Sequence, residues 1–215
     1  MPFTRMFKKE TVEGIKVIGI GGGGGNTVNT MVENFFAGVQ FIVADTDVQA
    51  LAKSRADIRL QLGPVITKGN GAGTDPNIGQ EAAQESYEIL HAALKGSVMV
   101  FVITCLGGGT GTGAAPVIAK LSKKTGALTL TIVTKPFCFE AKTRKCNAVS
   151  GWKKLKEYSD VIVTVPNDKL LNLMNRNSTI TDMLLMFDTL VSQAVKGIID
   201  LVNLSGYTNL DIPDR

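Results

Sequence analysis

Hydrophobic positions along the chain gather into short continuous runs separated by longer stretches of mixed character. Five runs have the length and apolar content of buried strands, at residues 15–20, 41–44, 98–106, 128–133 and 161–165. Successive runs are separated by segments long enough for crossover helices. This alternation predicts an α/β fold, a Rossmann-like parallel sheet with helices on both faces. Residues 59–62 are expected to add a weak edge strand.

The segments between the runs have helical character at residues 26–36, 75–94, 113–124 and 144–158. A longer helix is predicted at residues 180–204, and its apolar residues occupy more than one helical face. A helix of that kind normally has protein packed on several sides. We therefore expect a downstream domain or a partner to cover the side that this chain leaves open.

The strongest chemical signal is the sequence Gly-Gly-Gly-Thr-Gly-Thr-Gly at residues 107–113, directly behind the run 98–106. Glycines leave backbone N–H groups unshielded, and the hydroxyls of Thr110 and Thr112 can donate to phosphate oxygens. The residues that follow have helical character, with Pro116 in the expected first turn. The loop would therefore end at the positive amino end of a helix, as in phosphate-binding loops.

A second glycine cluster follows the first strand-like run. Gly21 to Gly25 are predicted to form a flexible turn, and Asn26 is placed to cap the next helix. Because both clusters follow strands of a parallel sheet, they should meet at its carboxyl edge and form one nucleotide site. Residues 63–76 are dense in glycine and proline and are expected to form a mobile loop that could reach over the ligand.

Two other classes of nucleotide-binding protein account for less of the chain. No lysine follows either glycine cluster at the place that a P-loop requires. The first cluster would suit a dinucleotide fold with Asp45 or Asp47 as the acid that binds ribose. That interpretation leaves residues 107–113 unexplained and offers no evident acid or base for hydride transfer, so an NAD-dependent oxidoreductase is the weakest alternative.

The composition is that of a soluble globular chain of 215 residues, and its net charge of +4 does not argue for nucleic acid. Three cysteines without a CxxC pair fit a reducing cytoplasm better than a disulfide framework. The apolar runs are far shorter than a membrane span, and no signal segment is evident. His91 is the only histidine, and we expect it to serve packing or the surface.

Six motifs occur in the order and spacing of one known family. They are IKVIGIGGGGGN, GNGAGTDP, GGGTGTGAAP, TKPFCFE, VPNDKLL and NLDIPD. Together they closely resemble the N-terminal GTPase domain of the FtsZ family, the bacterial homologues of tubulin in cell division, over residues 15–214. The resemblance implies binding of GTP and GDP with Mg²⁺, hydrolysis of GTP, and head-to-tail polymerisation into the filaments of the division ring.

The resemblance also implies which residues bind the nucleotide. Those assigned to the phosphates are Gly22, Gly23, Gly24, Gly25, Asn26, Gly73, Gly107, Gly108, Gly109, Thr110, Gly111 and Thr112. Glu140 holds the ribose with Arg144 beside it, and Asp188 at the head of the long helix binds guanine, since a carboxylate can accept from both N1–H and N2–H. Taken alone, Glu140 and Arg144 could be a surface pair, and Asp188 could be a helix-start acid.

Asn209, Asp211 and Asp214 match the family's catalytic loop, whose acids orient the attacking water. From Asp188 to residue 204 a helix rises about 24 Å at ~1.5 Å per residue. These acids should therefore act on the nucleotide of the next molecule, which predicts an open filament. The alternatives are that the acids form only a solvated helix exit, and that the protein is a nucleotide-binding polymer or regulatory module without turnover.

Several positions depart from the family pattern, namely Asp45, Asn70, Thr104, Cys105, Thr189 and Pro213. Asp45 would put a carboxylate near the phosphates, which could weaken binding or demand a cation. The chain is expected to end before the family's C-terminal domain, so its GTP turnover should be weak. No side chain is assigned as a metal ligand. The expected parts are an extension, a nucleotide-binding domain, the long helix and the catalytic loop, at residues 1–14, 15–178, 179–204 and 205–215.

The expected partners are further copies of the chain, and cell-division adaptors that bind through regions absent here. Neither nucleic acid nor direct membrane insertion is expected. The implied location is the cytoplasm, at the division site.

Overall fold

The computed structural model describes residues 14–34, 38–171 and 178–203. Within them the chain forms one sheet of six parallel strands. The strands are β1 (Ile15–Ile20), β2 (Val39–Asp45), β3 (Ile58–Gln61), β4 (Met99–Cys105), β5 (Leu128–Lys135) and β6 (Val161–Pro166). Their order is β3-β2-β1-β4-β5-β6, the doubly wound order of Rossmann-like folds. The predicted fold class is confirmed, including the edge strand β3.

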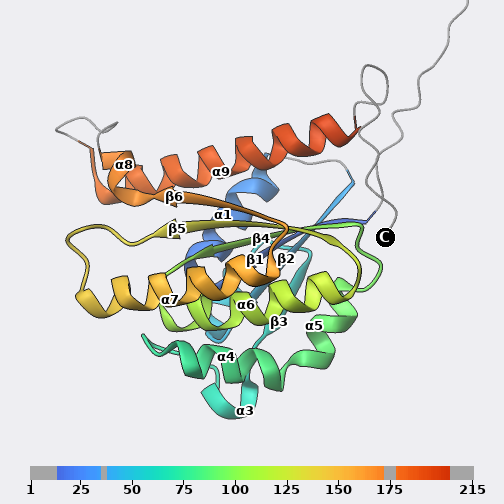
Figure 1. Ribbon diagram of the computed structural model, residues 1–215, viewed down its shortest axis with the longest axis horizontal. Helices are drawn as coiled ribbons and strands as arrows, with labels where there is room; N and C mark the ends of the chain where they lie inside the picture. Colours follow the sequence, from blue (N-terminus) through green and yellow to red (C-terminus); the bar gives the residue numbers. More distant parts are fainter. Residues whose placement is uncertain (1–13, 35–37, 172–177, 204–215) are drawn as a thin grey trace, which may run out of the picture.

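Helices connect these strands and cover both faces of the sheet (Figure 1). In the described residues they are α1 (Gly21–Glu33), α2 (Val48–Ala52), α3 (Pro64–Thr67), α4 (Pro76–Glu85), α5 (Tyr87–Leu94), α6 (Gly109–Lys124), α7 (Lys142–Tyr158), α8 (Asn167–Leu171) and α9 (Ile180–Asn203).

β1 occupies the centre of the sheet, between β2 and β4. Ile18 of β1 lies between Ile42 of β2 and Val102 of β4, and all three are fully buried. The direction in which the chain adds strands reverses between β1 and β4. In open parallel sheets, ligands bind at the carboxyl edge where this reversal occurs. Both glycine clusters follow these two strands.

The two faces of the sheet bury separate hydrophobic cores, because successive strand side chains point to opposite faces. On one face α1 and α9 pack on the strands through buried residues such as Val28, Phe187 and Val195. On the other face α4 to α7 pack on the strands, with Leu90 and Ala115 among the buried residues. In Figure 1, α9 therefore lies on the side of the sheet opposite to α4, α5, α6 and α7.

α1 begins at Gly21 rather than at Asn26. The expected flexible turn at Gly21 to Gly25 and the capping role of Asn26 are therefore wrong. The reason is close packing, because a Cβ on Gly24 would collide with the carbonyl oxygen of Ile103 in β4. Glycine disfavours helices by only about 1 kcal/mol per residue, so this fit of helix to sheet outweighs propensity.

α6 likewise begins at Gly109 rather than at Gly113, inside the signature sequence. A Cβ on Gly113 would collide with the carbonyl oxygen of Pro76, where α4 crosses close to α6. Pro116 therefore lies well inside the helix and not in its first turn. The amino end of α6 is thereby brought to the edge of the sheet where phosphate was predicted to bind.

The glycine- and proline-rich segment 63–76, predicted to be a mobile loop over the ligand, is not wholly irregular, and its mobility stays a prediction. It contains α3, in which Thr67 is buried. The backbone N–H groups of Val65 and Ile66 donate to the carboxylate of Glu85 in α4, at 2.9 and 3.1 Å. These bonds hold α3 against α4.

The single helix expected at residues 75–94 is two helices, α4 and α5, which meet at Ser86. The buried hydroxyl of Ser86 accepts from the N–H of Gly63 at 2.9 Å and donates to the carbonyl oxygen of Gln61 at 3.4 Å. The junction is thus tied to the end of β3.

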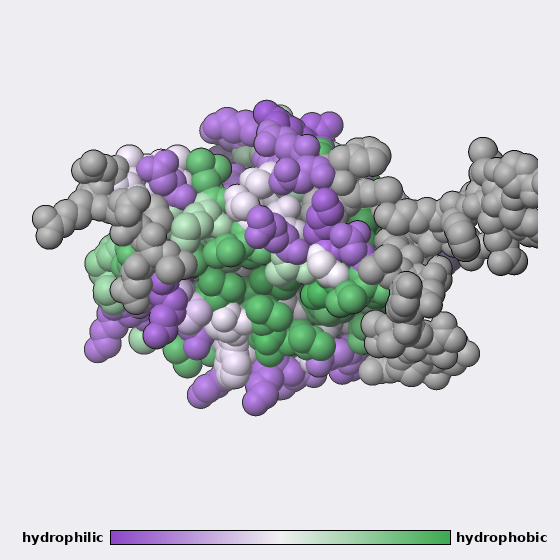
Figure 2. Space-filling model, turned by 90° about the horizontal axis from the view of Figure 1, so that it is seen from above, coloured by the Kyte–Doolittle hydropathy of each residue, from purple (hydrophilic) through white to green (hydrophobic). Residues whose placement is uncertain are grey.

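α9 packs on the sheet along one side only within the described residues. Its buried residues are Met183, Phe187, Asp188, Val191, Ser192, Val195 and Ile199. Its other side leaves large hydrophobic residues between 42 % and 56 % exposed, namely Leu184, Leu185, Leu190 and Leu201. Figure 2 looks onto this side of the molecule and shows hydrophobic residues gathered across its centre. None of the helices in the described ranges is both long and apolar enough to span a bilayer.

Candidate nucleotide site

The two glycine clusters touch where β1 and β4 end. A Cβ on Gly21 would lie 3.1 Å from the backbone nitrogen of Gly111. Between them is a hollow of about 190 Å³. Its lining is mostly backbone, from Ile20, Gly21, Gly22, Gly23, Gly73, Cys105, Gly108, Gly109, Thr110, Gly111 and Arg144. The first N–H groups of α6 have no side-chain cap, so this hollow is suited to an anion.

The signature turn is held in shape by its own hydrogen bonds. The N–H of Gly107 donates to the hydroxyl of Thr112 at 2.8 Å, and the N–H of Gly109 donates to the carbonyl oxygen of Gly73 at 3.0 Å. Thr112 is buried and does not line the hollow, whereas Thr110 does. Thr112 therefore shapes the turn, and Thr110 is the signature threonine that lines the hollow.

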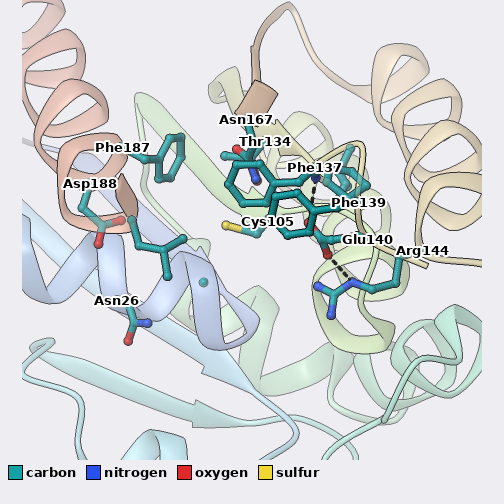
Figure 3. Close-up of a pocket in the computed structure, with 14 residues that line it drawn as sticks. Asn26, Cys105, Thr134, Phe137, Phe139, Glu140, Arg144, Asn167, Phe187 and Asp188 are labelled. Atoms are coloured by element: carbon teal, nitrogen blue, oxygen red, sulfur yellow. Dashed lines mark hydrogen bonds and ion pairs between the residues drawn. The ribbon is translucent and has the colours of Figure 1, made fainter. Parts of the chain in front are cut away.

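A larger cavity of about 350 Å³ adjoins this hollow and shares Gly23, Cys105 and Arg144 with it. Figure 3 shows Asp188 on one side of this cavity and Glu140 on the other, about the sulfur of Cys105. The full lining is Gly23, Asn26, Cys105, Leu106, Thr134, Pro136, Phe137, Phe139, Glu140, Arg144, Asn167, Leu184, Phe187 and Asp188. The structure thus brings an acidic cavity and a backbone-lined hollow side by side.

Four residues assigned to the phosphates line neither space. Gly24, Gly107 and Thr112 are buried behind the turns. Gly25 instead borders a separate hollow of about 260 Å³ beside Asp45. The remaining assigned residues lie at the hollow or the cavity.

Asp188 lies in the third turn of α9, so the interpretation of it as a helix-start acid is wrong. Only 6 % of it is exposed, and its Oδ1 accepts from the hydroxyl of Thr27 in α1 at 2.5 Å. Burial raises the pKa of Asp188 from 3.8 to about 6, against the opposing effect of the Thr27 bond. One oxygen is therefore positioned by α1, and the carboxylate lines the cavity as an acceptor.

Glu140 and Arg144 form an ion pair with 2.8 Å between Oε2 and Nε. The other oxygen of Glu140 accepts from the N–H of Phe137 at 2.7 Å, and only 20 % of the Glu140 side chain is exposed. The expected pairing of Glu140 with Arg144 is thus confirmed, and both residues line the cavity, while their contact with a ribose stays a prediction. Phe137 stacks on Phe139 beside it, with ring centroids 4.9 Å apart.

Sequence reasoning missed several lining residues. Phe187 immediately precedes Asp188, and Asn167 lies in the motif VPNDKLL, so both could have been found from their neighbours. Cys105 had no such signal; its thiol faces the cavity, and burial raises its pKa to about 11. Thr27, which bonds to Asp188 but does not itself line the cavity, had no signal either, because the two residues are 161 positions apart.

Asp45 does not point a free carboxylate at the phosphate hollow. Its Oδ1 accepts from the N–H groups of Thr46 and Asp47, at 2.7 and 3.2 Å. Burial raises the pKa of Asp45, and these two bonds oppose that effect. The hydroxyl of Thr46 lies 2.6 Å from that of Thr110. The departure at Asp45 is therefore accommodated by the adjoining backbone.

Two other departures lie away from the cavity. Thr189 is exposed, and its hydroxyl donates to the carbonyl oxygen of Leu185 in its own helix at 2.8 Å. The backbone of Asn70 forms an isolated antiparallel β-bridge with that of Asp47. The predicted catalytic residues Asn209, Asp211 and Asp214, as well as Pro213, lie outside the described residues. In the part of the chain that is described, no three His, Cys, Asp or Glu side chains cluster as metal ligands would.

Comparison with known proteins agrees with this geometry. Residues 14–175 match the family model of the tubulin/FtsZ family, GTPase domain. The chain is 48 % identical over 200 residues to the cell division protein FtsZ of Coxiella burnetii, covering 93 % of this chain and 52 % of that protein. It therefore spans about half the length of that relative.

Solved structures give the same result. An empty FtsZ dimer of M. jannaschii superposes with a TM-score of 0.87 at 42 % identity, over 94 % of this chain and 58 % of that one. CetZ2 from Haloferax volcanii, in a GTPγS-bound protofilament, shares the fold with a TM-score of 0.81 at 21 % identity, over 92 % of this chain and 61 % of that one. The chain belongs to the tubulin/FtsZ family, as its GTPase domain.

Proposed function

We propose that the chain binds GTP and GDP across the two adjoining spaces and is the catalytic domain of a cell-division GTPase. One observation carries the proposal: the uncapped amino end of α6 lines a hollow that opens into a cavity with a buried carboxylate, Asp188, on its far side. Phosphates suit the hollow, because backbone N–H groups and the helix dipole favour anions. A base and sugar suit the cavity.

Asp188 selects guanine in this proposal. An ionised carboxylate accepts hydrogen bonds and donates none, so it pairs with guanine N1–H and N2–H. Adenine presents a bare N1 at the corresponding edge and offers no such pair of donors, so Asp188 would keep the Thr27 hydroxyl but lose the paired contact with the base. Sites built to pair with a donor reject analogues that lack it strongly, because their own polar group is then left unsatisfied.

Glu140 and Arg144 position the ribose. Each oxygen of Glu140 has one partner in the structure, Phe137 or Arg144, and a carboxylate oxygen can accept more than one hydrogen bond. A sugar hydroxyl can therefore donate to Glu140 without breaking the existing bonds.

Mg²⁺ would neutralise the charge of the β- and γ-phosphates when GTP is bound. The carboxylates of Asp45 and Asp47 each accept hydrogen bonds from two backbone N–H groups, and neither residue lines the hollow. The ion would thus be held mainly by the phosphates themselves.

Hydrolysis is proposed to need a second molecule. From Asp188 to Asn203, α9 rises about 22 Å at ~1.5 Å per residue. Asn209, Asp211 and Asp214 follow the end of α9 that points away from the cavity, which favours their action on the nucleotide of the next subunit in a head-to-tail filament. The apolar side of α9 would be covered by the remainder of a longer protein. A cytoplasmic location at the division site, and adaptors that bind beyond this segment, belong to the same proposal.

Titration calorimetry tests the nucleotide assignment. GDP and GTP are expected to bind at least about a hundredfold more tightly than ADP and ATP. Equal affinities would refute the assignment to guanine.

Phosphate release separates this proposal from its alternative, a nucleotide-binding module without turnover. GTP turnover per molecule should rise with protein concentration, and rise further when a full-length relative is added. Asp211→Ala should abolish the turnover that depends on assembly while leaving GDP affinity nearly unchanged. Bound nucleotide without phosphate release in every mixture would favour the module.

A further inference from the structure

A groove of about 540 Å³ lies on the opposite side of the sheet from α9, apart from the candidate nucleotide site. α6 packs between α4 and α7 and forms the floor of this groove (Figure 1). Gln80 and Gln84 of α4, with Tyr87 of α5, line one wall, and Lys154 and Tyr158 of α7 line the other. Its volume is in the range of ordinary ligand sites.

Residues on the floor recur every three or four positions along α6, from Pro116 to Lys124. They therefore lie on one face of the helix and give the groove a length of about 12 Å at ~1.5 Å per residue. An extended peptide of about four residues spans that length at ~3.3 Å per residue. The groove has no residue in common with the nucleotide cavity or the phosphate hollow.

The charge of the groove is unbalanced. Lys120 and Lys124 on the floor and Lys154 on the wall face a single lining carboxylate, Glu157. Ion pairs in the described residues involve other lysines and arginines, so none of these three ammonium groups is paired with a carboxylate there. A carboxylate of a ligand could therefore pair with these lysines without displacing an ion pair formed within the described residues.

Neutral groups hold two of these lysines. Lys120 lies over the ring of Tyr158, with its Nζ 5.2 Å from the centroid, and Lys154 donates to the amide oxygen of Gln80 at 3.2 Å. A carboxylate is a stronger acceptor than either an aromatic face or an amide oxygen. Of the acids nearby on α4, Glu85 is engaged by the N–H groups of α3.

We propose that this groove binds an extended acidic segment of a partner protein. Its carboxylates would pair with Lys120, Lys124 and Lys154, and its apolar side chains would pack on the two tyrosines. A protein segment fits better than an anionic membrane, because the floor lysines lie between two walls that a narrow chain can enter and a flat surface cannot.

The test uses the whole 215-residue chain without nucleotide and a hexapeptide library of the form Glu-Asp-X-X-Asp-Glu, in which X is any residue except cysteine. The basic library Lys-Arg-X-X-Arg-Lys and anionic phosphatidylserine vesicles are the comparison probes. Saturable binding of the acidic library is expected, with amide NMR shifts confined to α4 to α7. Shifts elsewhere, no binding, or binding of the vesicles alone would overturn the proposal.

Charge variants make the test specific. Lys120→Glu combined with Lys154→Glu should weaken binding of the acidic library by about tenfold or more. Lys154→Glu alone and Lys153→Glu make the same change in charge, one inside the groove and one outside it, so Lys154→Glu should weaken binding and Lys153→Glu should leave it within about twofold. Should the double variant fail to fold by circular dichroism, Lys120→Gln with Lys154→Gln replaces it. An equal loss in Lys153→Glu would overturn the proposal.

Saturating GDP separates this groove from the nucleotide site. The acidic library is expected to bind equally with and without GDP, since the two sites share no residue. Competition by GDP would mean that the peptides enter the nucleotide cavity, and would overturn the proposal. Failure of GDP itself to bind would contradict only the proposed GTPase function.

Discussion

The two ends of the candidate nucleotide cavity each present a carboxylate, and the chain places these two acids in opposite environments. Asp188 is buried in α9 and accepts a hydrogen bond from the hydroxyl of Thr27. Glu140 has the guanidinium of Arg144 and a backbone N–H as partners. Because Asp188 is buried and is not paired with a cation in the described residues, its pKa is raised to about 6. Under the proposed binding mode, this contrast would make the Asp188 end select the base and the Glu140 end position the ribose.

Removal of the buried acid should have the largest effect. Asp188→Ala is expected to weaken GDP binding by about a hundredfold, because two charge-assisted hydrogen bonds to guanine are lost. ADP binding should change little, so base selectivity should collapse. Titration calorimetry with both nucleotides measures this.

Asp200→Ala is the matched control for that variant, since it removes an exposed acid from the same helix. Its GDP affinity should equal that of the unaltered chain. GDP affinity retained in Asp188→Ala would contradict the assignment of the base end.

Removal of Glu140 at the proposed ribose end should weaken nucleotide binding less, and should not change the preference for guanine over adenine. Glu140→Ala should weaken GDP and ADP by the same factor, about tenfold, because the lost hydrogen bond is to the sugar. The variant should also lose any preference for GDP over 2′,3′-dideoxy-GDP. A selective loss of GDP over ADP would show that Glu140 contacts the base and would erase the contrast between the two ends.

The protonation of Asp188 should make binding depend on pH. Guanine needs the ionised carboxylate, and the ligand-free protein protonates it as pH falls through about 6. GDP affinity should therefore decrease about tenfold between pH 7 and pH 5. Calorimetry across this range measures the change. Asp188→Asn should bind GDP weakly with no such dependence, and an unchanged pH profile in that variant would assign the titration to another group.

The smallest effect is on stability. The folded chain holds the proton on Asp188 more tightly than the unfolded chain does, because burial raises its pKa from 3.8 to about 6. This contribution to stability is fully present below about pH 4 and is lost as pH rises through 6.

At pH 7.5 Asp188→Asn should therefore stabilise the ligand-free protein, by on the order of 1 kcal/mol after discounting for solvent in the open cavity. Thermal unfolding would show this as a rise of about 2–4 °C. Asparagine retains an oxygen for the Thr27 hydroxyl, so the comparison isolates the charge. A lower melting temperature would mean that the ionised Asp188 stabilises the fold.

Much of the fold could be predicted from the sequence, since a parallel sheet buries its strands on both faces and leaves continuous apolar runs. The run at residues 15–20 matches β1 at both ends, and the other strands differ by at most two residues at either end. The starts of α1 and α6 could not be predicted. Glycine signals a turn by its local preference, and only the neighbouring carbonyl groups of Ile103 and Pro76 reveal that it is required inside these helices.

By itself the sequence determined the family, the succession of strands with their main crossover helices, and the two glycine clusters that follow strands at one edge of the sheet, because these depend on local patterns and spacing. Only the tertiary structure decided which of those residues face a common space. Thr112 turned inward, Asp188 met Thr27 from 161 residues away, and three lysines that form no ion pair within the described residues came together around α6. Burial and electrostatic environment depend on contacts between distant segments, and no local pattern carries that information.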